Sequence, residues 1–488
     1  MLNAMPWTDI LPSELALASK LKTSAKITGV TCDSRSVGAG VLFFAIPGTQ
    51  NDGHDFVEEV LSKGAFAVVE REACYEAHPN VIRVSSCRKA FSLACAAWFG
   101  HPSAHFQLVG VTGTNGKTTT AHLCEQVWEA LGFKTGRLGT VNYKVGDQIL
   151  ESALTTPDAY TVQSLFSQMR ASGVCFSVME VSSIALDQDR VLGSRFAAAL
   201  YTNLTQDHLD YHGDVESYFA AKEKLFREMS PGFAVICTED EFGRRLQSQP
   251  YPVYTFSRLD RNADFYAQDL RCDLAGSRAR VRTPSGFVDL RLHILGGHNV
   301  INAVGVLALC HGLGLEAEAV AHALSNAKGA PGRLEAVRAK GRAHVFVDYA
   351  HTPDALLNVL RLLHDVRGQS GGKVFCVFGC GGDRDKGKRP LMARVACEWS
   401  DVCIATSDNP RTEDPDAILD DIEKGISRGT TQYKREVDRR KAIGLALSMA
   451  GPRDIVLIAG KGHENYQILG TTKIHFDDVE VVRDYYQI

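Results

Sequence analysis

The stretch FQLVGVTGTNGKTTT, residues 106–120, decides the fold of this chain. A short apolar run (107–111) predicts a strand that meets a glycine-rich turn, and a helical pattern (121–131) follows the Lys-Thr pair. This layout is typical of a phosphate-binding loop, in which backbone N–H groups surround phosphate oxygens. The spacing G-x-x-G-K-T is shorter than the general form, because Val111 stands at the place of its first glycine. We therefore expect a nucleotide site, with an ordinary strand-to-helix turn as the alternative.

Four residues of this loop have distinct expected roles. Gly113 and Gly116 tolerate left-handed backbone angles and let the main chain close around phosphate oxygens. Lys117 can reach the β and γ phosphates of a nucleotide, and the Thr118 hydroxyl can ligate Mg²⁺. The loop thus predicts a nucleotide that is bound together with a divalent cation.

The composition is that of a globular protein. Of the 488 residues, 45% are hydrophobic and 23% are charged, and the apolar runs are too short to cross a bilayer. The net charge of −4 gives no electrostatic reason to expect binding to nucleic acid or to a membrane surface. The first residues, MLNAMPWTDILPSEL, lack the basic and apolar regions of a secretory signal. We expect a cytoplasmic protein with no nucleic-acid partner and no membrane insertion.

The 13 cysteines are scattered and form no C-x-x-C pair. Several lie in apolar stretches, among them Cys95, Cys175, Cys237 and Cys403. Reduced, buried thiols are therefore expected, with a disulfide or metal framework as the alternative.

Two candidate linkers, HPSA (101–104) and GAPGR (329–333), divide the chain into three blocks. We expect domains at 1–103, 104–331 and 332–488. In the last two, apolar strand candidates alternate with helices, which is typical of buried parallel strands in doubly wound α/β sheets. The strand candidates are 107–111, 174–180, 197–202, 232–237, 252–256, a hairpin over 279–294, and 344–348, 373–379, 401–406 and 454–459.

In the middle block, polar residues follow the predicted strands. Glu180 ends one strand and is a candidate Mg²⁺ ligand, since Mg²⁺ takes hard oxygen donors; a helix N-cap or a paired structural carboxylate is the alternative. His208 and His212 are four residues apart, but no H-E-x-x-H pattern supports zinc. Asn302 falls on the first turns of a helix, where its amide could read an adenine edge.

A predicted helix over 215–229 carries a lysine within its apolar stripe. Lys222 lies four residues after Tyr218 and three after Phe219. Periodicity alone favours a lysine that extends from a half-buried face into water. The functional alternative is a lysine directed into the site.

In the last block, polar clusters follow three predicted strands, at 377–390, 405–415 and 458–467. Because the carboxyl ends of parallel strands meet at one sheet edge, these clusters should converge. Arginines beside acids suit a zwitterionic amino acid, and ordinary loop polarity is the alternative. A fourth strand end carries Asp348 and His351, which either contact a nucleotide or belong to a helix N-cap region. The charged and amide residues of the three clusters are Arg384, Asp408, Asn409, Arg411 and Glu464.

Together these motifs resemble the Mur ligase family, whose members build the peptide stem of bacterial peptidoglycan. The resemblance covers nearly the whole chain, and DNPR, GGDRDKGKRP and GKGHENYQ are similar to the segments of the members that add meso-diaminopimelate. The other segments that carry it are TGTNGKTTT (112–120), MEVSS (179–183), 203–212, HNVINA (298–303), PGR (331–333) and DYAHTPD (348–354).

The resemblance implies an N-terminal mixed α/β UDP-binding domain, a central P-loop parallel-sheet ATPase domain and a C-terminal Rossmann-like domain that binds an amino acid. It also implies roles for residues at matching positions. For ATP these are Gly113, Thr114, Asn115, Gly116, Lys117, Thr118, Thr119, Asn302, Arg333, Asp348 and His351. For the UDP-muramoyl-dipeptide they are Cys32, Ser34, Thr49, Gln50, Asn51, Thr155, Thr156, Ser182, Gln188 and Arg190. For diaminopimelate they are Arg384, Asp408, Asn409, Pro410, Arg411, Gly460 and Glu464.

The resemblance further implies two Mg²⁺ ions near the phosphate loop. Thr118 and Glu180 match ligands of one ion, and Glu180, His208 and a carbamylated lysine match the surroundings of the second. That lysine corresponds to Lys222, so the resemblance favours the functional interpretation of its position. The catalytic residues implied are Lys117, Lys222, Glu180 and His208.

The implied reaction is ATP-driven amide formation through an acyl phosphate. The implied partners are ATP, UDP-MurNAc-L-Ala-D-Glu and meso-diaminopimelate, and we expect a monomer. A lysine-adding Mur ligase and a ligase like folylpolyglutamate synthase remain alternatives, although Arg411 favours diaminopimelate because it can pair with the additional carboxylate. From another class, the chain could be a P-loop ATPase that acts as a switch or scaffold.

Overall fold

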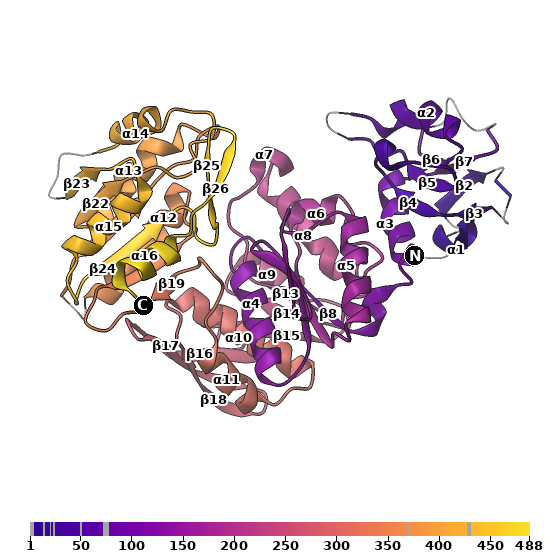
Figure 1. Ribbon diagram of the computed structural model, residues 1–488. Helices are drawn as coiled ribbons and strands as arrows, with labels where there is room; N and C mark the ends of the chain where they lie inside the picture. Colours follow the sequence, from indigo (N-terminus) through magenta and orange to yellow (C-terminus); the bar gives the residue numbers. More distant parts are fainter. Residues whose placement is uncertain are drawn as a thin grey trace. The chain divides into compact units, whose positions relative to one another are not determined.

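The computed structural model describes residues 4–12, 15–19, 21–22, 25–48, 51–71, 78–368, 371–426 and 431–488. They form two compact units, one of residues 1–266 and 304–317 and the other of 267–303 and 318–488 (Figure 1). Both units are α/β, as expected from the alternating pattern. No helix among the described residues is both long enough and apolar enough to cross a membrane.

The N-terminal part of the first unit is a mixed five-stranded sheet of order β2-β7-β6-β5-β4. Strands β4 to β7 are parallel, and β2 runs antiparallel at one edge. Helix α3 packs its apolar side on this sheet, where Phe91 meets Phe44 with ring centroids 5.3 Å apart. The elements are β1 (Met5–Pro6), α1 (Trp7–Ile10), β2 (Ala16–Ser19), β3 (Lys26–Ile27), β4 (Gly29–Thr31), β5 (Val41–Phe44), α2 (Val57–Ser62), β6 (Phe66–Val69), β7 (Val81–Val84) and α3 (Cys87–Trp98).

In the rest of the first unit, the strands lie in the order β11-β10-β9-β12-β8-β13-β14-β15. The six strands β9, β12, β8, β13, β14 and β15 are parallel to one another, and β10 and β11 form an antiparallel edge. The strands are β8 (Gln107–Thr112), β9 (Thr135–Leu138), β10 (Asn142–Val145), β11 (Gln148–Glu151), β12 (Phe176–Glu180), β13 (Ala198–Tyr201), β14 (Phe233–Cys237) and β15 (Val253–Ser257). The helices are α4 (Lys117–Ala130), α5 (Ala159–Ala171), α6 (Ser183–Asp187), α7 (Leu209–His212), α8 (Val215–Arg227) and α9 (Glu241–Leu246).

The predicted strands of this unit are confirmed within two residues at each end, and two details were wrong. Helix α4 begins at Lys117 and not at residue 121, because the left-handed Gly116 (φ 88°) turns the loop directly into the helix. Cys175 is exposed, since β12 begins only after it. The twelve described cysteines are all free thiols.

The second unit contains the predicted hairpin and a six-stranded sheet of order β19-β20-β24-β21-β22-β23, parallel except for β19. The strands of the second unit, including those outside the six-stranded sheet, are β16 (Phe265–Asp273, which starts in the first unit), β17 (Gly276–Thr283), β18 (Gly286–Leu292), β19 (Glu335–Val337), β20 (His344–Asp348), β21 (Val374–Phe378), β22 (Val402–Ala405), β23 (Gln432–Arg435), β24 (Ile455–Ala459), β25 (Tyr466–Leu469) and β26 (Thr472–His475).

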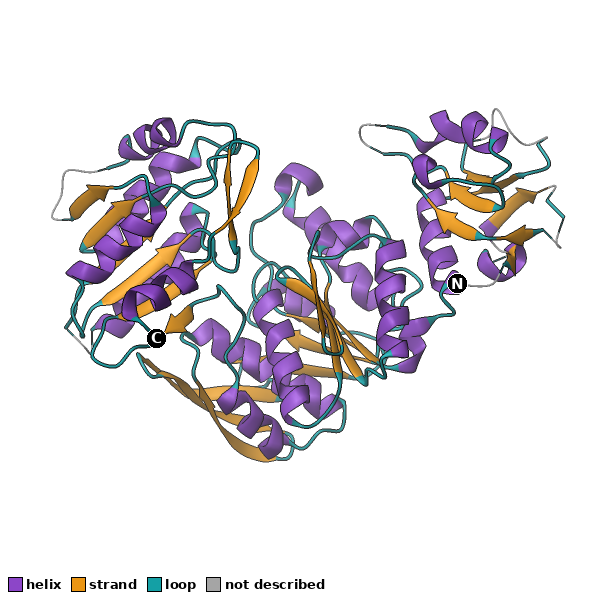
Figure 2. Ribbon diagram, viewed as in Figure 1, coloured by secondary structure: helices purple, strands orange, loops and turns teal. Residues whose placement is uncertain are grey.

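Helices cover both faces of this six-stranded sheet (Figure 2), which confirms the expected Rossmann-like arrangement. One face carries α12 (Pro353–Arg367), α13 (Lys388–Trp399) and α14 (Pro415–Glu423). The other carries α15 (Arg439–Met449) and α16 (Asp478–Tyr486). Because both faces are covered, the central strands are apolar throughout, which is why the sequence pattern found them. The remaining helices are α10 (Gly297–Gly312) and α11 (Ala317–Asn326).

Candidate active site

The phosphate loop between β8 and α4 is closed by its own lysine. Lys117 Nζ donates hydrogen bonds of 2.8 Å to the carbonyl oxygens of Gly113 and of Thr114. Gly113 has φ 145°, and a Cβ at this position would lie 2.0 Å from Thr202 Oγ1. Glycine is therefore required at residue 113 both for its backbone angle and for space.

The segment after β13 supports the loop from the side, a role that sequence reasoning did not assign. Thr202 Oγ1 and Asn203 Nδ2 donate to Asn115 O at 2.6 and 3.1 Å, and Asn115 N donates to Asn203 Oδ1 at 3.0 Å. Thr205 N donates to Thr114 Oγ1 at 3.0 Å. The signal available in the sequence was the position of these polar residues directly after a buried strand.

Glu180 lies at the end of β12, fully buried beside the phosphate loop. Its Oε2 accepts hydrogen bonds from Thr118 Oγ1 at 2.8 Å and from Thr140 Oγ1 at 3.1 Å, and its Oε1 accepts from Thr140 N at 2.9 Å. A Cβ on Gly139 would lie 2.3 Å from Glu180 Oε1, so this glycine makes room for the carboxylate. Thr140 was not identified from the sequence, because nothing in its neighbourhood marks it.

The Thr118–Glu180 pair has the chemistry of a magnesium ligand set. It brings a hydroxyl and a carboxylate together at the start of α4, and both are hard oxygen donors of the kind Mg²⁺ prefers. Among the described residues, no group of three or more His, Cys, Asp and Glu side chains is placed to hold a metal ion. Mg²⁺ beside a nucleotide usually completes its coordination with phosphate oxygens and water.

Lys222 on α8 is buried against the same loop, with 1% of its surface exposed. Its Nζ donates 2.9 Å to Gly113 O and lies 4.4 Å from the centroid of the Tyr218 ring. Burial, together with the Lys117 charge, lowers the pKa of Lys222 well below its usual value. Periodicity alone favoured a half-exposed lysine that extends into water, and this interpretation is wrong, because Lys222 is buried and directed at the loop.

His208 contacts this cluster through its ring, whose centroid lies 6.1 Å from that of Tyr218. It has φ 52°, its side chain is 47% exposed, and its Nε2 lies 3.7 Å from Asp207 Oδ2. Within the described residues it makes no hydrogen bond to Glu180 or Lys222. The neighbouring His212 is held instead, by a 2.9 Å contact between Nε2 and Ser183 Oγ.

Five of the residues matched to the UDP-muramoyl-dipeptide, those of the range 155–190, form one connected network next to Glu180. Thr156 Oγ1 donates to Glu180 O at 2.8 Å and accepts from Ser182 N at 3.0 Å. Arg190 donates to Thr156 O and to Gln188 Oε1. Thr155 Oγ1 lies 3.1 Å from Thr140 Oγ1, which links this network to the carboxylate of Glu180.

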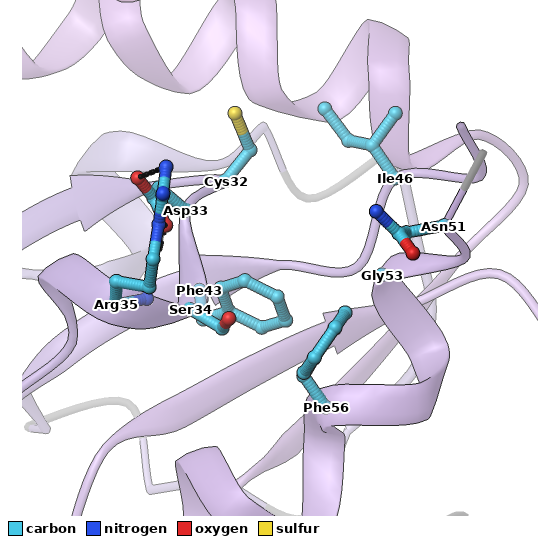
Figure 3. Close-up of a pocket in the computed structure, with 9 residues that line it drawn as sticks. All are labelled: Cys32, Asp33, Ser34, Arg35, Phe43, Ile46, Asn51, Gly53 and Phe56. Carbon is cyan, nitrogen blue, oxygen red and sulfur yellow. Dashed lines mark hydrogen bonds and ion pairs between the residues drawn. The ribbon is translucent and has the colours of Figure 1, made fainter. Parts of the chain in front are cut away.

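The N-terminal sheet carries a cavity of about 530 Å³ (Figure 3). Three matched residues, Cys32, Ser34 and Asn51, line it, together with Phe43 and Phe56. Aromatic side chains beside polar groups suit a planar, hydrogen-bonding ring. Two other matched positions, Thr49 and Gln50, lie outside the described residues.

In the second unit, the turns after β21, β22 and β24 meet, as the sequence predicted. Asn409 Nδ2 donates 2.8 Å to Glu464 Oε2, and Gln467 Nε2 donates 2.6 Å to Asp408 O. A Cβ on Gly460, whose φ is 117°, would lie 2.6 Å from Asp408 Oδ2.

Two arginines of this region differ in how firmly they are held. Arg411 has φ 52°, its backbone N donates to Ile468 O at 3.1 Å, and its Nη1 donates to Gly382 O at 2.7 Å. Pro410 precedes it. Arg384 is exposed and donates to its neighbour Asp383 O at 3.4 Å, and within the described part of the chain no hydrogen bond joins it to the other members of the cluster.

The positions matched to the nucleotide in this unit also lie together in part. Asp348 is buried and accepts from Leu334 N at 2.7 Å and Ala350 N at 2.8 Å. Burial raises its pKa, an effect opposed by Arg333 and by these two hydrogen bonds. The Arg333 guanidinium lies 4.6 Å from the Tyr349 ring centroid, and the His351 ring lies 4.7 Å from it. Asn302, by contrast, is buried, with its amide donating to Asn299 Oδ1 at 3.3 Å.

Comparison with protein-family models gives three matches in order along the chain. Residues 26–98 match the model described as Mur ligase family, catalytic domain. Residues 111–310 match Mur ligase middle domain, and 332–462 match Mur ligase, glutamate ligase domain.

Two similar relatives carry the name UDP-N-acetylmuramoyl-L-alanyl-D-glutamate--2,6-diaminopimelate ligase. The protein from Geobacillus kaustophilus is 43% identical, over 94% of each chain. The protein from Gloeobacter violaceus is 46% identical, over 94% of this chain and 93% of its own. A solved structure with the same name matches at a TM-score of 0.75 and 32% identity, over 99% of each chain. On the strength of these matches, this chain belongs to the Mur ligase family.

Proposed function

We propose that this chain is an ATP-dependent ligase that adds meso-2,6-diaminopimelate to the D-Glu residue of UDP-MurNAc-L-Ala-D-Glu in peptidoglycan precursor synthesis. The observation that carries the proposal is the similarity, over 94% of the chain, to relatives named for this activity. The phosphate loop beside buried Glu180 and the cluster around Asn409, Arg411 and Glu464 support it independently.

The chemistry requires positioning more than a protein nucleophile. The γ-phosphoryl group passes from ATP to the D-Glu side-chain carboxylate, and ADP leaves. The amine of diaminopimelate then attacks the acyl phosphate, a tetrahedral intermediate forms, and phosphate leaves as the amide forms. Lys117 would neutralise charge on the transferred phosphoryl group, and the loop N–H groups would orient it. Mg²⁺ held by Thr118 and Glu180 would supply further charge neutralisation.

We propose that Lys222 functions as a carbamate. Burial lowers the pKa of the Lys222 amine and so favours its neutral form, which can attack CO₂, forming an N–C bond and releasing one proton. The product is an anion, which the positive charge of Lys117 would favour, whereas the same charge disfavours a cationic Lys222. Glu180, His208 and this carbamate would surround a second Mg²⁺.

We also propose three functional domains, at 1–103, 104–331 and 332–488, which would bind the UDP moiety, ATP and the amino acid. The three family-model matches fall inside these ranges and support the boundaries. A monomeric, cytoplasmic enzyme is part of this proposal, since all three substrates are water-soluble.

The decisive experiment is an ATP-dependent ligation assay with UDP-MurNAc-L-Ala-D-Glu, in which diaminopimelate and L-lysine are offered side by side. The expected result is formation of the diaminopimelate tripeptide with release of phosphate. Phosphate release without any muramoyl nucleotide would indicate an ATPase switch or scaffold. Preference for L-lysine, or for glutamate on a folate, would assign the chain to one of the other ligase classes.

A further inference from the structure

A second fully buried lysine lies in the turn after β24. Lys461 has 0% exposed surface. Its Nζ donates to Tyr466 O, and it lies 3.4 Å from Glu464 Oε2 and 3.5 Å from Asn409 Oδ1. A lysine ammonium has three donors, and here each has an oxygen acceptor. The buried Lys461 side chain therefore has its hydrogen-bonding capacity satisfied.

These contacts determine how the Asn409 amide is oriented. Its Oδ1 accepts from Ile468 N at 3.0 Å and from Lys461 Nζ, which have no acceptor capacity. The Nδ2 group must then face the other way, where it donates to Glu464 Oε2 at 2.8 Å. Lys461 thus acts on Glu464 twice, directly and through Asn409.

These contacts leave the two oxygens of the Glu464 carboxylate in different surroundings. Glu464 Oε2 accepts from both Asn409 Nδ2 and Lys461 Nζ, whereas no described protein group donates to Oε1. The Glu464 side chain keeps 18% of its surface exposed. An ammonium group arriving from solvent can therefore pair with Oε1 without displacing a protein contact.

We propose that Lys461 is a positioning residue that fixes Glu464 and Asn409 for the ammonium group of the incoming amino acid. This inference rests on the proposed function, because it takes the cluster around Glu464 as the acceptor pocket. Lys461 is shielded from solvent and acts on the substrate only through its two neighbours. Its effect should therefore fall on the amino acid and not on the two nucleotide substrates.

A purely structural lysine predicts a different outcome. Loss of a buried lysine that only stabilises the fold would either leave the three KM values unchanged or change them all by a similar factor. A positioning residue predicts a selective rise in the KM for one substrate, because uniform binding of that substrate is lost. The comparison of the three KM values separates these cases.

The test uses the full-length enzyme with Lys461→Met, Lys461→Gln and the control Lys473→Met. Lys473 is exposed on β26 and lies 4.1 Å from the same Tyr466 ring that Lys461 Nζ faces at 5.3 Å. The control therefore makes the same substitution near the same ring without touching Asn409 or Glu464. Circular dichroism and thermal melting establish that each variant is folded.

For Lys461→Met we expect the KM for diaminopimelate to rise about tenfold or more, while the KM values for ATP and the muramoyl nucleotide change less than about twofold. Lys461→Gln keeps a hydrogen-bond donor but no charge, so its KM for diaminopimelate should lie between those of wild type and Lys461→Met. The KM values of Lys473→Met should match those of wild type. Equal changes in all three KM values, an unchanged KM for diaminopimelate, or failure of both Lys461 variants to fold would each overturn the inference. A wild-type enzyme that does not ligate diaminopimelate would instead refute the proposed function.

Discussion

The two buried lysines, Lys222 beside the phosphate loop and Lys461 beside the acceptor cluster, are equally hidden from solvent but have opposite surroundings. Lys461 Nζ has a carboxylate, an amide oxygen and a carbonyl oxygen as acceptors. Lys222 Nζ has one carbonyl acceptor, an aromatic ring and, among the described residues, no ion pair. Burying a charge without a partner is costly, so burial favours the neutral amine of Lys222, whereas Lys461 Nζ has an oxygen acceptor for each of its donors.

This difference shows that burial alone does not reveal what a lysine does. The acceptors around the nitrogen decide whether it is a stable cation or a reactive amine. Lys222 has too few acceptors to serve as a buried structural cation. Lys461 has an acceptor for each of its donors, so its nitrogen is not available as a reactive amine. The predictions below test this contrast, beginning with the largest effect.

The largest effect is expected for Lys222→Ala. Removing the amine removes the proposed carbamate, and we expect kcat to fall on the order of 10²- to 10³-fold or more, as for other groups that stabilise transition-state charge. Wild type stripped of CO₂ should lose activity and recover it with bicarbonate, and Lys222→Ala should not respond. Intact activity in the variant would end the proposed role of Lys222.

The next effect concerns the choice of amino acid. Arg411→Ala removes a guanidinium that is held over the acceptor turns by Gly382 O. We expect kcat/KM for diaminopimelate to fall about 30-fold or more, as when one partner of a charge pair is truncated, with little change in the low activity towards L-lysine. Kinetics with both amino acids measure the ratio. An unchanged preference for diaminopimelate over L-lysine would show that Arg411 does not bind the second carboxylate of diaminopimelate.

The lysine contrast also predicts stability changes of opposite sign. Lys461→Met breaks a compensated cluster and should lower the free energy of unfolding by about 1–3 kcal/mol. Lys222→Met replaces an uncompensated amine by an apolar group and should be neutral or stabilising. Urea unfolding of both variants measures the difference. Equal destabilisation would contradict the assignment of one lysine as paired and the other as unpaired.

The pH dependence of the free energy of unfolding should differ between wild type and Lys222→Met. Because the pKa of Lys222 is lowered in the folded state, the unfolded chain binds more protons at this site wherever the pH lies below the ordinary lysine pKa of about 10.4 and above the folded value. Its contribution to stability therefore rises with pH across that window and is lost as the pH falls. Lys222→Met should remove this component, which unfolding measured in CO₂-free buffers would reveal as a flatter profile.

The smallest effect is expected for Tyr218→Phe. This change removes the hydroxyl that lies 3.1 Å from Thr114 Oγ1 and keeps the ring beside Lys222. We expect a loss of about 1 kcal/mol, seen as a KM for ATP about fivefold higher, with the response to bicarbonate unchanged. If the bicarbonate response were also lost, the hydroxyl and not only the ring would be needed for the carbamate.

The sequence allowed the strands and the phosphate loop to be predicted because both are local patterns. Continuous apolar runs mark strands covered on both faces, and Gly113, Gly116 and Lys117 lie within five residues. The convergence of the three acceptor turns followed from the geometry of parallel strands. The roles of the positions matched to the UDP-muramoyl-dipeptide, and the carbamate at Lys222, came only from the resemblance.

What could not be predicted depends on contacts between distant segments. Thr140 meets Glu180 across 40 positions, and Lys461 meets Asn409 across 52. Neither residue stands out in its own neighbourhood, since Thr140 is an ordinary loop threonine and Lys461 is an ordinary lysine in a polar turn. Their significance comes from which acceptors the fold places beside them.

Gly332 has a consequence for how the substrates are aligned. It has φ 63°, it accepts a 2.9 Å hydrogen bond from Tyr349 N, and a Cβ here would lie 2.1 Å from His463 N. The backbone that carries Arg333 is thus pressed against the backbone that carries Glu464, with no side chain between them. Under the proposed function, this close packing would keep Arg333 and Glu464 at one spacing, so that the nucleotide and the amino acid need not be brought to that spacing anew in each catalytic cycle.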